Sequence, residues 1–452
     1  MVYIVCINNV LEEQQMSFEK IIGYENVKEE LSRLLDVLKN KEKYAKLGVK
    51  QPQGLLIYGE QGIGKTLFAT SFINDSNRKC FVCRKDKADG DFVNHIKSIF
   101  DKASNEIPSI VLLDDIDKFS NEDEQYVNTE EYITVQSCID QVKDKDVYVV
   151  ATANNIDVLP KSLKRDGRFD NRIQMSIPTG ENANKIIRHF LSNLSLMDEE
   201  TIADVTKILE GKSTAEIESI INEAGIRAGY NNKTKIETDD IIKAYLRKEY
   251  ETPDFSDNMD EYYLKRVAYH EAGHVVVEEE LNFGTVNLVS ILDNKFSDKC
   301  GITNFETDEY YFYDKTFMEN RVMTLLGGKA ATELVYGATD VGCNNDLHRA
   351  FDIVTRFVDN YCSFDFSSFG HAGSSNELRE RIDDRVAQEM QKYYLEAKNI
   401  LTNNREYLDG IAELLLEKKI ITQKDIREVA RRCTRSLPKD YYVKKEQMDN
   451  EN

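Results

Sequence analysis

The sequence lacks any long apolar stretch, and this absence narrows where the protein can act. No apolar run approaches the roughly 20 residues that a membrane-spanning helix needs. The apolar opening Met1–Ile7 is too short for a span and has no basic flank, which excludes a signal peptide. Together these absences predict a cytoplasmic protein with no direct membrane span.

Basic residues are scarce relative to acidic ones. The chain has 59 lysines and arginines against 80 aspartates and glutamates, a net charge of −21. This balance argues against nucleic acid and against an anionic membrane surface as partners. Tryptophan is absent, yet 41% of the 452 residues are apolar, which is enough to bury the cores of two or three domains.

The 8 cysteines are scattered along the chain, as expected for reduced thiols. Cys80 and Cys83 form a lone C-x-x-C pair. A structural zinc site would need two further ligands, and the sequence contains no second pair. We therefore expect no structural zinc there.

The segment Tyr263–Glu280 contains no proline and is predicted to be a helix. Residues four apart share one face of a helix, so His270 and His274 could hold one zinc ion. Glu271 follows the first histidine and could reach a water on the metal without ligating the metal itself. This H-E-x-x-H arrangement is typical of zinc peptidases, which use two ligands and a general base.

A catalytic zinc also needs a third protein ligand, which usually comes from elsewhere in the chain. Spacing alone does not choose among the downstream candidates, which are Glu333, Asp340, Asp346 and His348.

A second chemical motif lies nearer the N-terminus. The apolar run Gly54–Tyr58 predicts a buried strand and leads into Gly59–Thr66, which has the pattern G-x-x-x-x-G-K-T. A helical stretch follows from Leu67, so the motif has the strand–loop–helix context that a phosphate-binding loop requires. Its glycines let backbone N–H groups surround phosphates at a helix N-terminus. Lys65 would contact the β- and γ-phosphates, and Thr66 would ligate Mg²⁺.

Two further apolar runs, Ser109–Leu113 and Val147–Ala151, predict buried strands. The first ends in Asp114 and Asp115, as expected for the acid that holds Mg²⁺ in this class of nucleotide site. The second ends in Thr152–Asn154. Strands that alternate with helices form a parallel sheet, and ligands bind at the carboxyl ends of its strands. We therefore expect these polar endings to lie at one edge of the sheet.

Taken together, these motifs resemble one family closely: the FtsH-type AAA+ zinc metalloproteases, hexameric machines that use ATP to pull proteins into a peptidase ring. The resemblance runs from about residue 17 to residue 429 and has both motifs in the family's order. It also includes Ala151–Asn154, Arg165–Asp170, Tyr336-Gly337 and Asn345–Leu347.

The resemblance implies a fold class. We expect an α/β AAA+ P-loop ATPase domain, with a parallel sheet and a helical lid subdomain, followed by a mainly α-helical, zincin-like peptidase domain. The expected parts are an N-terminal arm (1–16), the large ATPase subdomain (17–180), the lid subdomain (181–252), a linker (253–261), the peptidase domain (262–438) and a charged tail (439–452).

The resemblance also implies roles for single residues of the nucleotide site. ATP with Mg²⁺ would contact Asp114, and Ile22 and Gly23 would line the adenine pocket. The phosphate-binding positions would be Gly59, Glu60, Gln61, Gly62, Ile63, Gly64, Lys65, Thr66 and Leu67.

Four further residues have implied catalytic roles at the nucleotide site. Asp115 would polarise the attacking water and Asn154 would act as the sensor that positions it. Arg165 and Arg168 would complete the site of a neighbouring subunit, which implies a homo-hexamer. At the peptidase site, the resemblance selects Asp346 as the third zinc ligand.

The sequence departs from the family pattern in three places. The family's acidic strand end is Asp-Glu, whereas here it is Asp114-Asp115, and the second carboxylate is one methylene shorter. The family's translocating loop carries an aromatic residue, but our alignment places Ala88–Gly90 there, and Phe92 is the nearby substitute. The family usually has membrane-spanning helices before the ATPase domain, whereas this sequence shows no such helices. Membrane proteins are therefore less expected as substrates here.

The sequence thus predicts an ATP-dependent zinc metalloprotease. Zn²⁺ held by His270, His274 and Asp346 would activate a water, and Glu271 would be the general base. ATP turnover would deliver polypeptides to this site. One alternative is a AAA+ protein-remodelling ATPase with weak or no proteolysis. The other is a zinc peptidase of unfolded chains with a nucleotide-gated scaffold.

Overall fold

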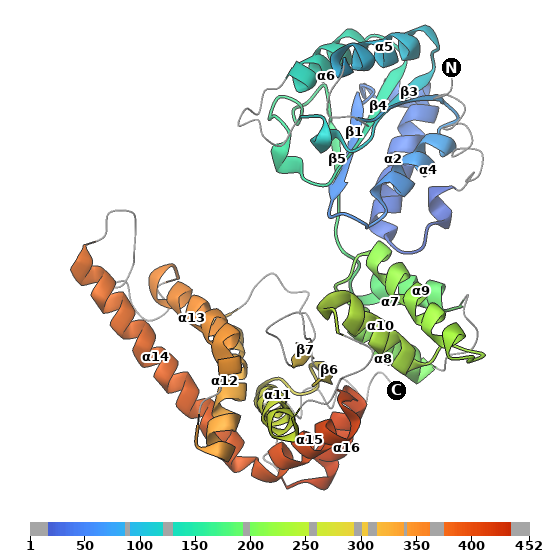
Figure 1. Ribbon diagram of the computed structural model, residues 1–452. Helices are drawn as coiled ribbons and strands as arrows, with labels where there is room; N and C mark the ends of the chain where they lie inside the picture. Colours follow the sequence, from blue (N-terminus) through green and yellow to red (C-terminus); the bar gives the residue numbers. More distant parts are fainter. Residues whose placement is uncertain are drawn as a thin grey trace. The chain divides into compact units, whose positions relative to one another are not determined.

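The structure is a computed structural model (Figure 1). It describes residues 17–85, 91–120, 130–192, 199–252, 260–292, 301–305, 314–338, 341–361 and 375–434. Contacts divide the chain into two compact units. The first comprises Met1–Leu196 and Glu210–Asn222, and the second comprises Met197–Leu209 and Glu223–Asn452.

The first unit is built on a five-stranded sheet in which every neighbouring pair is parallel. Its strand order is β2-β3-β4-β1-β5. The strands are β1 (Gly54–Gly59), β2 (Lys79–Cys83), β3 (Ser109–Leu113), β4 (Val147–Ala153) and β5 (Asn171–Met175). The central strands β3 and β4 are buried along their whole length, which explains why their sequences are continuous apolar runs.

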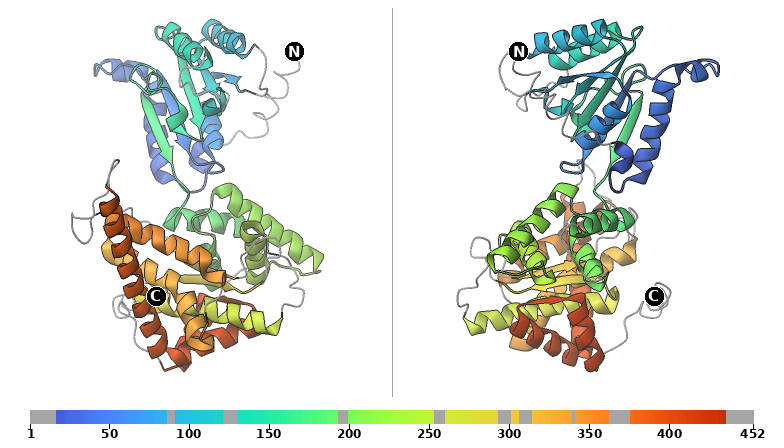
Figure 2. Two further views of the ribbon diagram at one scale, coloured as in Figure 1. Left: turned by 60° about the vertical axis from the view of Figure 1, so that its left-hand side comes forward. Right: turned by 90° about the vertical axis from the view of Figure 1, so that its right-hand side faces the viewer.

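Helices cover both faces of this sheet (Figures 1 and 2). They are α2 (Glu25–Lys39), α4 (Lys65–Asp75), α5 (Phe92–Asn105) and α6 (Glu130–Gln141). Helix α4 packs on β1 and β4, where the rings of Phe72 and Tyr148 lie 6.4 Å apart. Helices α5 and α6 share a hydrophobic core with the opposite face. The predicted α/β class with a parallel sheet is confirmed.

Short helical turns connect the main elements. They are η1 (Phe18–Lys20), α3 (Lys41–Ala45), η2 (Ile116–Lys118), η3 (Ile156–Val158) and η4 (Val341–Cys343).

Four helices follow the parallel sheet: α7 (Gly180–Ser192), α8 (Glu199–Leu209), α9 (Thr214–Tyr230) and α10 (Thr238–Tyr250). Helix α7 belongs to the first unit, whereas α8 and α10 belong to the second. Helix α10 begins with a capping box in which Glu237 and Asp240 each bind the other's backbone N–H.

The rest of the second unit is mainly helical, as expected. Its helices are α11 (Glu261–Leu281), α12 (Lys315–Tyr336), α13 (Asn344–Asp359), α14 (Asn376–Asn403), α15 (Arg405–Lys418) and α16 (Gln423–Arg432). Strands β6 (Val286–Ser290) and β7 (Ile302–Phe305) pair antiparallel. A third strand, β8 (Ile420–Thr422), gives the antiparallel order β7-β6-β8 and was not predicted.

Helices α11 and α12 cross at a point where both backbones lack side chains. A Cβ atom at Gly273 would lie 2.4 Å from the carbonyl oxygen of Gly327, a separation that real Cβ atoms do not adopt. The small residues of the segment Leu326–Ala331 allow this close approach. The contact brings α12 directly against the H-E-x-x-H segment of α11.

Among the described residues, no helix is both long and apolar enough to cross a membrane.

Candidate functional site

The phosphate-binding motif lies where strand β1 ends and helix α4 begins. Gly62 and Gly64 have φ angles of 81° and 95°, a left-handed backbone that favours glycine. Gly64 caps helix α4, so the loop leads directly into a helix N-terminus, where anions are stabilised. Helix α9 also contacts this loop, because the N–H of its residue Ala215 donates to the carbonyl oxygen of Gly62 at 2.9 Å.

Lys65 is the first residue of α4, and its side chain is buried within the loop, with 6% exposure. Its ammonium group donates to the carbonyl oxygen of Glu60 at 2.5 Å. Burial lowers the pKa of Lys65, while the nearby carboxylates of Asp115 and Asp117 act against that shift. The remaining predicted loop positions, Gln61, Ile63 and Leu67, lie beside it, and among these Ile63 is buried.

Asp114 and Thr66 meet at the carboxyl edge of the sheet, as expected. One oxygen of the Asp114 carboxylate accepts from Thr66 Oγ1 at 3.1 Å and from Thr152 Oγ1 at 2.8 Å. The hydroxyl of Thr152 also accepts the N–H of Asp115 at 2.9 Å. These contacts assemble the ends of β3, β4 and the start of α4 into one polar cluster.

Asp115 has an unusual backbone, because its φ angle is 53°. A left-handed conformation costs a residue other than glycine roughly 1–2 kcal/mol, and such strain persists mainly at functional sites. One carboxylate oxygen of Asp115 pairs with the ammonium of Lys118 at 2.7 Å. We did not predict this partner, although a lysine three residues after Asp115 is visible in the sequence.

Asn154 lies at the end of β4, beside the same cluster. Its N–H donates to the Asp117 carboxylate at 3.1 Å, and the N–H of Asn155 donates to the same oxygen at 3.2 Å. Asp117, which the sequence analysis did not single out, therefore fixes the backbone of the predicted sensor.

Ile22 and Gly23 line a hollow of about 460 Å³. Its other lining residues come from both sides of the hollow: Glu19, Lys20, Ile21, Glu25, Lys28, Lys185, Arg188 and His189. A Cβ atom at Gly23 would touch Ile186 of α7 at 3.4 Å, so the hollow lies between residues 19–28 and this helix. No phosphate-loop residue lines it.

The two predicted arginine fingers have different surroundings. Arg165 is exposed and has no hydrogen bond or ion pair to any described residue. Arg168 is 5% exposed, and its guanidinium donates to Asp140 at 2.8 and 3.4 Å, and to the carbonyl oxygen of Ser162 at 2.7 Å. The Arg168 guanidinium is thus bound by residues of its own chain, whereas the Arg165 guanidinium has no partner among the described residues.

The metal-binding candidates converge in the second unit. His270 and His274 lie one turn apart on α11, and their Nε2 atoms are 3.1 Å apart. Asp346, near the start of α13, places Oδ2 at 3.3 Å from His270 Nε2 and at 3.4 Å from His274 Nε2. These three side chains form a group whose ligand atoms all lie within 4.8 Å of one another. Two imidazole nitrogens and one carboxylate oxygen are the donor set of a catalytic zinc.

The surroundings of this group fit a metal ion. His274 Nδ1 lies 2.7 Å from the carbonyl oxygen of Thr324 on α12, which fixes its proton on Nδ1 and leaves Nε2 to ligate. Room is kept open by Gly328, because a Cβ atom there would lie 2.6 Å from Nε2 of both His270 and His274.

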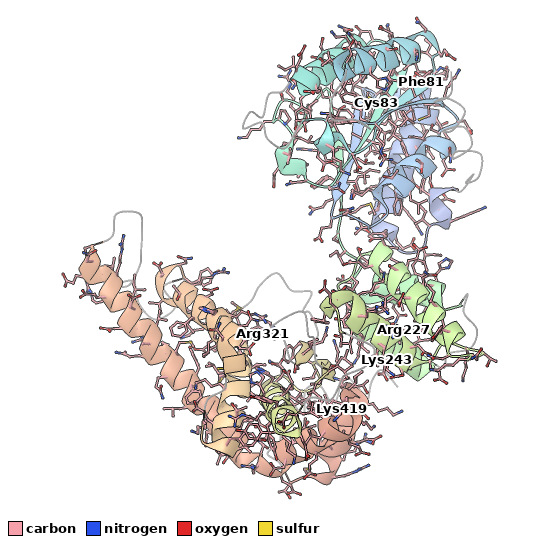
Figure 3. All side chains as sticks on the ribbon, viewed as in Figure 1. Phe81, Cys83, Arg227, Lys243, Arg321 and Lys419 are labelled. Atoms are coloured by element: carbon pink, nitrogen blue, oxygen red, sulfur yellow. The ribbon has the colours of Figure 1, made fainter. Side chains whose placement is uncertain are left out.

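The other candidates for the third ligand lie elsewhere. Glu333 binds the hydroxyl of Tyr394 and the ammonium of Lys329. His348 is exposed on α13 and is absent from the ligand group. Asp340 lies outside the described residues. Cys83 is buried in the core of the first unit (Figure 3), and the C-x-x-C pair belongs to no candidate metal group among the described residues.

Asp346 and His274 shift each other's protonation. Burial raises the pKa of Asp346, but hydrogen bonds to the two histidines outweigh it and hold this pKa well below the usual range. Burial lowers the pKa of His274, but the hydrogen bond and charge of Asp346 outweigh it and raise this pKa to about 9. A protonated imidazole does not ligate a metal, so zinc binding below pH 9 must release this proton.

We expect the apparent zinc affinity to rise by about tenfold per pH unit between pH 7 and pH 8.5, because one proton leaves His274 for each ion bound. Chelator competition at several pH values measures this slope. An affinity that is flat over this range would show that His274 is already neutral. His348→Ala is the matched control, since this exposed histidine lies outside the ligand group and its loss should leave the slope unchanged.

Glu271 lies beside the ligand group, with its side chain turned toward strand β7. It is 5% exposed, and its Oε2 accepts from Thr303 Oγ1 at 2.6 Å. Strand β7 begins close to the same carboxylate, because a Cβ atom at Gly301 would lie 2.3 Å from Glu271 Oε1. Sequence reasoning missed both contacts, since no local spacing links residue 271 to residues 301 and 303.

The predicted translocating positions Ala88–Gly90 lie outside the described residues. Phe92 is the first residue of α5 and is half-buried, with its ring edge-on to Phe119 at 4.9 Å.

Comparisons with known proteins found two matching family models. The family model "ATPase family associated with various cellular activities (AAA)" matches residues 55–177, and "Peptidase family M41" matches residues 257–429. The chain is 29% identical to the ATP-dependent zinc metalloprotease FtsH 2 of Thermoanaerobacter sp. (strain X514) over 93% of this chain and 85% of that protein. It is 28% identical to FtsH of Aster yellows witches'-broom phytoplasma, over 93% of this chain and 64% of that protein. It is also 28% identical to FtsH of Helicobacter pylori (strain J99), over 92% of this chain and 71% of that protein.

The fold and the two sites therefore define a P-loop ATPase joined to a metallopeptidase. The chain belongs to the FtsH-type AAA+ zinc metalloprotease family. It is accordingly an ATP-dependent zinc metalloprotease, with Zn²⁺ as the cofactor of the peptidase site and ATP with Mg²⁺ as that of the ATPase site. The predictions of family, enzyme class and cofactors are confirmed.

Proposed function

We propose that this protein assembles as a homo-hexamer that hydrolyses ATP to deliver polypeptides to the peptidase site around His270, His274 and Asp346. One observation carries the proposal. Three ligand atoms of a catalytic zinc site converge beside the buried carboxylate of Glu271, in a chain that also has an intact phosphate-binding loop. A structural zinc would normally be closed by four protein ligands, often cysteines.

At the peptidase site, His270, His274 and Asp346 would hold zinc. When bound, zinc acts as a Lewis acid that makes water a nucleophile near neutral pH. Glu271 accepts a proton from the attacking water and later donates it to the leaving amine. The hydroxyl of Thr303 binds Glu271 Oε2 and keeps the carboxylate oriented while the proton moves. The buried position of Glu271 excludes competing water from the carboxylate.

At the nucleotide site, Lys65, Thr66 and Asp114 would hold ATP with Mg²⁺, which supplies the phosphoryl group to be transferred. Asp115 orients the attacking water, and Asn154 positions it from the neighbouring strand. Arg165 completes the site of the adjacent subunit. Because Arg168 is bound by Asp140 of its own chain, we assign it to holding the Arg165 loop rather than to contacting the neighbour's phosphates.

The shortened acid at Asp115 should make ATP hydrolysis slow but measurable, because a carboxylate still faces the site. We expect Asp115→Asn to lower phosphate release by about 100-fold or more, the scale of a lost acid–base group. Asp115→Glu should raise it, since the longer side chain reaches past its pair with Lys118. Asp144→Asn, at an exposed surface aspartate, is the control. Normal hydrolysis by Asp115→Asn would remove this residue from the mechanism.

Action of Arg165 across subunits predicts complementation. Lys65→Ala subunits keep Arg165, and Arg165→Ala subunits keep Lys65, so each variant alone should hydrolyse little ATP. A mixture should recover ATPase activity, because some interfaces then combine an intact Lys65 with a neighbour's Arg165. Steady-state phosphate release across mixing ratios measures this. Arg172→Ala, at an exposed arginine on β5, should behave as wild type.

No recovery at any ratio, together with specific activity that is independent of protein concentration, would contradict a trans-acting Arg165. It would also remove the support that Arg165 gives to the proposed hexameric ring.

The delivery function is tested by comparing substrates. The zinc-loaded protein should cleave an unfolded protein, and ATP should accelerate cleavage more than a non-hydrolysable analogue does. A remodelling ATPase would unfold a fluorescent domain without cutting it. A nucleotide-gated peptidase would cut unfolded chains equally well with ATP and with the analogue. Either result would replace the proposal.

A further inference from the structure

Strand β7 carries two contacts on successive residues, and they point in opposite directions. Thr303 Oγ1 donates to Glu271 Oε2 on α11 at 2.6 Å. Asn304 Nδ2 donates to the hydroxyl oxygen of Tyr245 on α10, also at 2.6 Å. Adjacent strand residues face opposite sides, so one four-residue strand is held between the catalytic base and a helix of the segment that precedes the peptidase domain.

Strand β7 has limited support of its own. Among the described strands it is one of the two edge strands and pairs with β6 alone, and a register shift interrupts that ladder between Val286 and Leu288. All its described side chains are only half-buried. On α12, Arg321, labelled in Figure 3, lies 4.7 Å from the ring of Phe305 and adds one contact at its end. A short edge strand with few partners depends on each contact that fixes it.

Tyr245 is a rigid anchor for this strand. Its side chain is 1% exposed on α10, and its ring meets Tyr250 nearly edge-on at 6.0 Å. Burial raises the pKa of Tyr245 far above the usual range, so the hydroxyl remains protonated at every working pH. Asn304 therefore donates to a hydroxyl whose position is set by a packed core.

A second contact joins the same helical segment to this sheet. Asn287 of β6 donates through Nδ2 to the carbonyl oxygen of Lys207 on α8 at 3.2 Å, and the Lys207 ammonium lies 3.3 Å from Gln423 Oε1. Helix α8 thus contacts β6 while α10 contacts β7. Both helices belong by their contacts to the unit that contains the peptidase site.

We infer that Tyr245 and Asn304 are positioning residues for the peptidase reaction: through β7 and the Thr303 hydroxyl they hold the Glu271 carboxylate in its working orientation. Helix α10 is then part of the support of the peptidase site rather than of the ATPase alone. The inference rests on the proposed function, because that function assigns Glu271 as the general base. Misplacing a reacting group by a fraction of an ångström lowers turnover without changing the affinity for substrate.

The test measures cleavage of a short quenched peptide, which needs no unfolding, by the full-length zinc-loaded protein. Tyr245→Phe removes only the hydroxyl, and Asn304→Ala removes its donor. Each should lower kcat by about 3- to 10-fold with KM unchanged. The double variant should lose no more than either single variant, because both remove one interaction. Thr303→Val should lower kcat by about 10-fold or more, and Thr303→Ser, which keeps the hydroxyl, should restore it.

Two readouts separate positioning from general damage. Zinc affinity by chelator competition should be unchanged in every variant, since no ligand is altered. Amide hydrogen exchange at residues 302–305 should become faster in Tyr245→Phe and Asn304→Ala. Tyr393→Phe is the matched control: it removes another buried hydroxyl, one that donates to Glu319 at 2.8 Å, and should leave kcat and β7 exchange as in wild type.

An unchanged kcat in Tyr245→Phe and Asn304→Ala would overturn the inference, even if β7 exchange increases, because the contact would then be structural only. A matching loss of kcat in Tyr393→Phe would overturn it too. If zinc-loaded wild type cleaves no peptide at all, the proposed function fails first. The exchange data would then still report whether the Tyr245–Asn304 contact exists.

Discussion

Glu271→Gln should lower peptide cleavage by about 100-fold or more while zinc remains bound, because an amide cannot accept the proton of the attacking water. Glutamine is nearly isosteric, and its side chain can still accept from Thr303, so helix α11 and strand β7 should keep their places. His270, His274 and Asp346 are untouched, so the metal site survives. The measurement pairs peptide cleavage with zinc content of the same protein sample.

Two comparisons make this result decisive. Asp346→Ala should lose both zinc and cleavage, because it removes one of the three converging ligand atoms. ATPase activity should persist in Glu271→Gln, since the phosphate-binding loop lies in the other unit. If Glu271→Gln cleaves peptide at the wild-type rate, this carboxylate is not the base. If zinc-loaded wild type also cleaves nothing, the remodelling alternative stands.

Local spacing was sufficient to predict the residues that share one element. His270 and His274 are one helical turn apart, and this periodicity alone places their Nε2 atoms together, at 3.1 Å. The strand–loop–helix context likewise placed Lys65 at the start of α4. In both cases the chemistry depends on neighbours in sequence, so no knowledge of the tertiary fold was needed.

Residues that meet through the tertiary fold could not be chosen in this way. Four downstream candidates for the third ligand were equivalent by spacing, and it is the packing of α13 on α12, which itself packs on α11, that brings Asp346 to the histidines. Thr303 and Thr324 bind the base and a ligand from strand β7 and helix α12, respectively. No pattern in the sequence links them to α11, because their contacts depend on where β7 and α12 pack.

The short strand β8 was missed for a related reason. It has only three residues, Ile420–Thr422, between two helices, so it has too few residues for an alternating pattern. Its pairing with β6 is what makes it a strand, and that pairing joins residues more than a hundred positions apart. Lys118, the partner of Asp115, is close to it in sequence. The distance of 2.7 Å between the Lys118 ammonium and the Asp115 carboxylate nevertheless depends on the tight turn of η2.

Lys65→Ala should abolish ATP hydrolysis and with it the ATP-driven part of proteolysis. The ammonium of Lys65 is held inside the phosphate-binding loop by the carbonyl oxygen of Glu60. Removing it takes away the positive charge that faces the β- and γ-phosphates. Phosphate release should fall to background, while ATP-independent cleavage of a short peptide continues, because the zinc ligands lie in the other unit.

Lys79→Ala provides the matched control for this loss. Lys79 is likewise the first residue of its element, but it lies at the amino end of strand β2 and pairs with Glu106 at the surface, away from the carboxyl edge where the polar cluster lies. Its removal should leave ATP hydrolysis unchanged. Full ATPase activity in Lys65→Ala would show that ATP binds elsewhere. Loss of peptide cleavage together with ATPase activity would instead show that the peptidase site needs nucleotide even for substrates that are already unfolded.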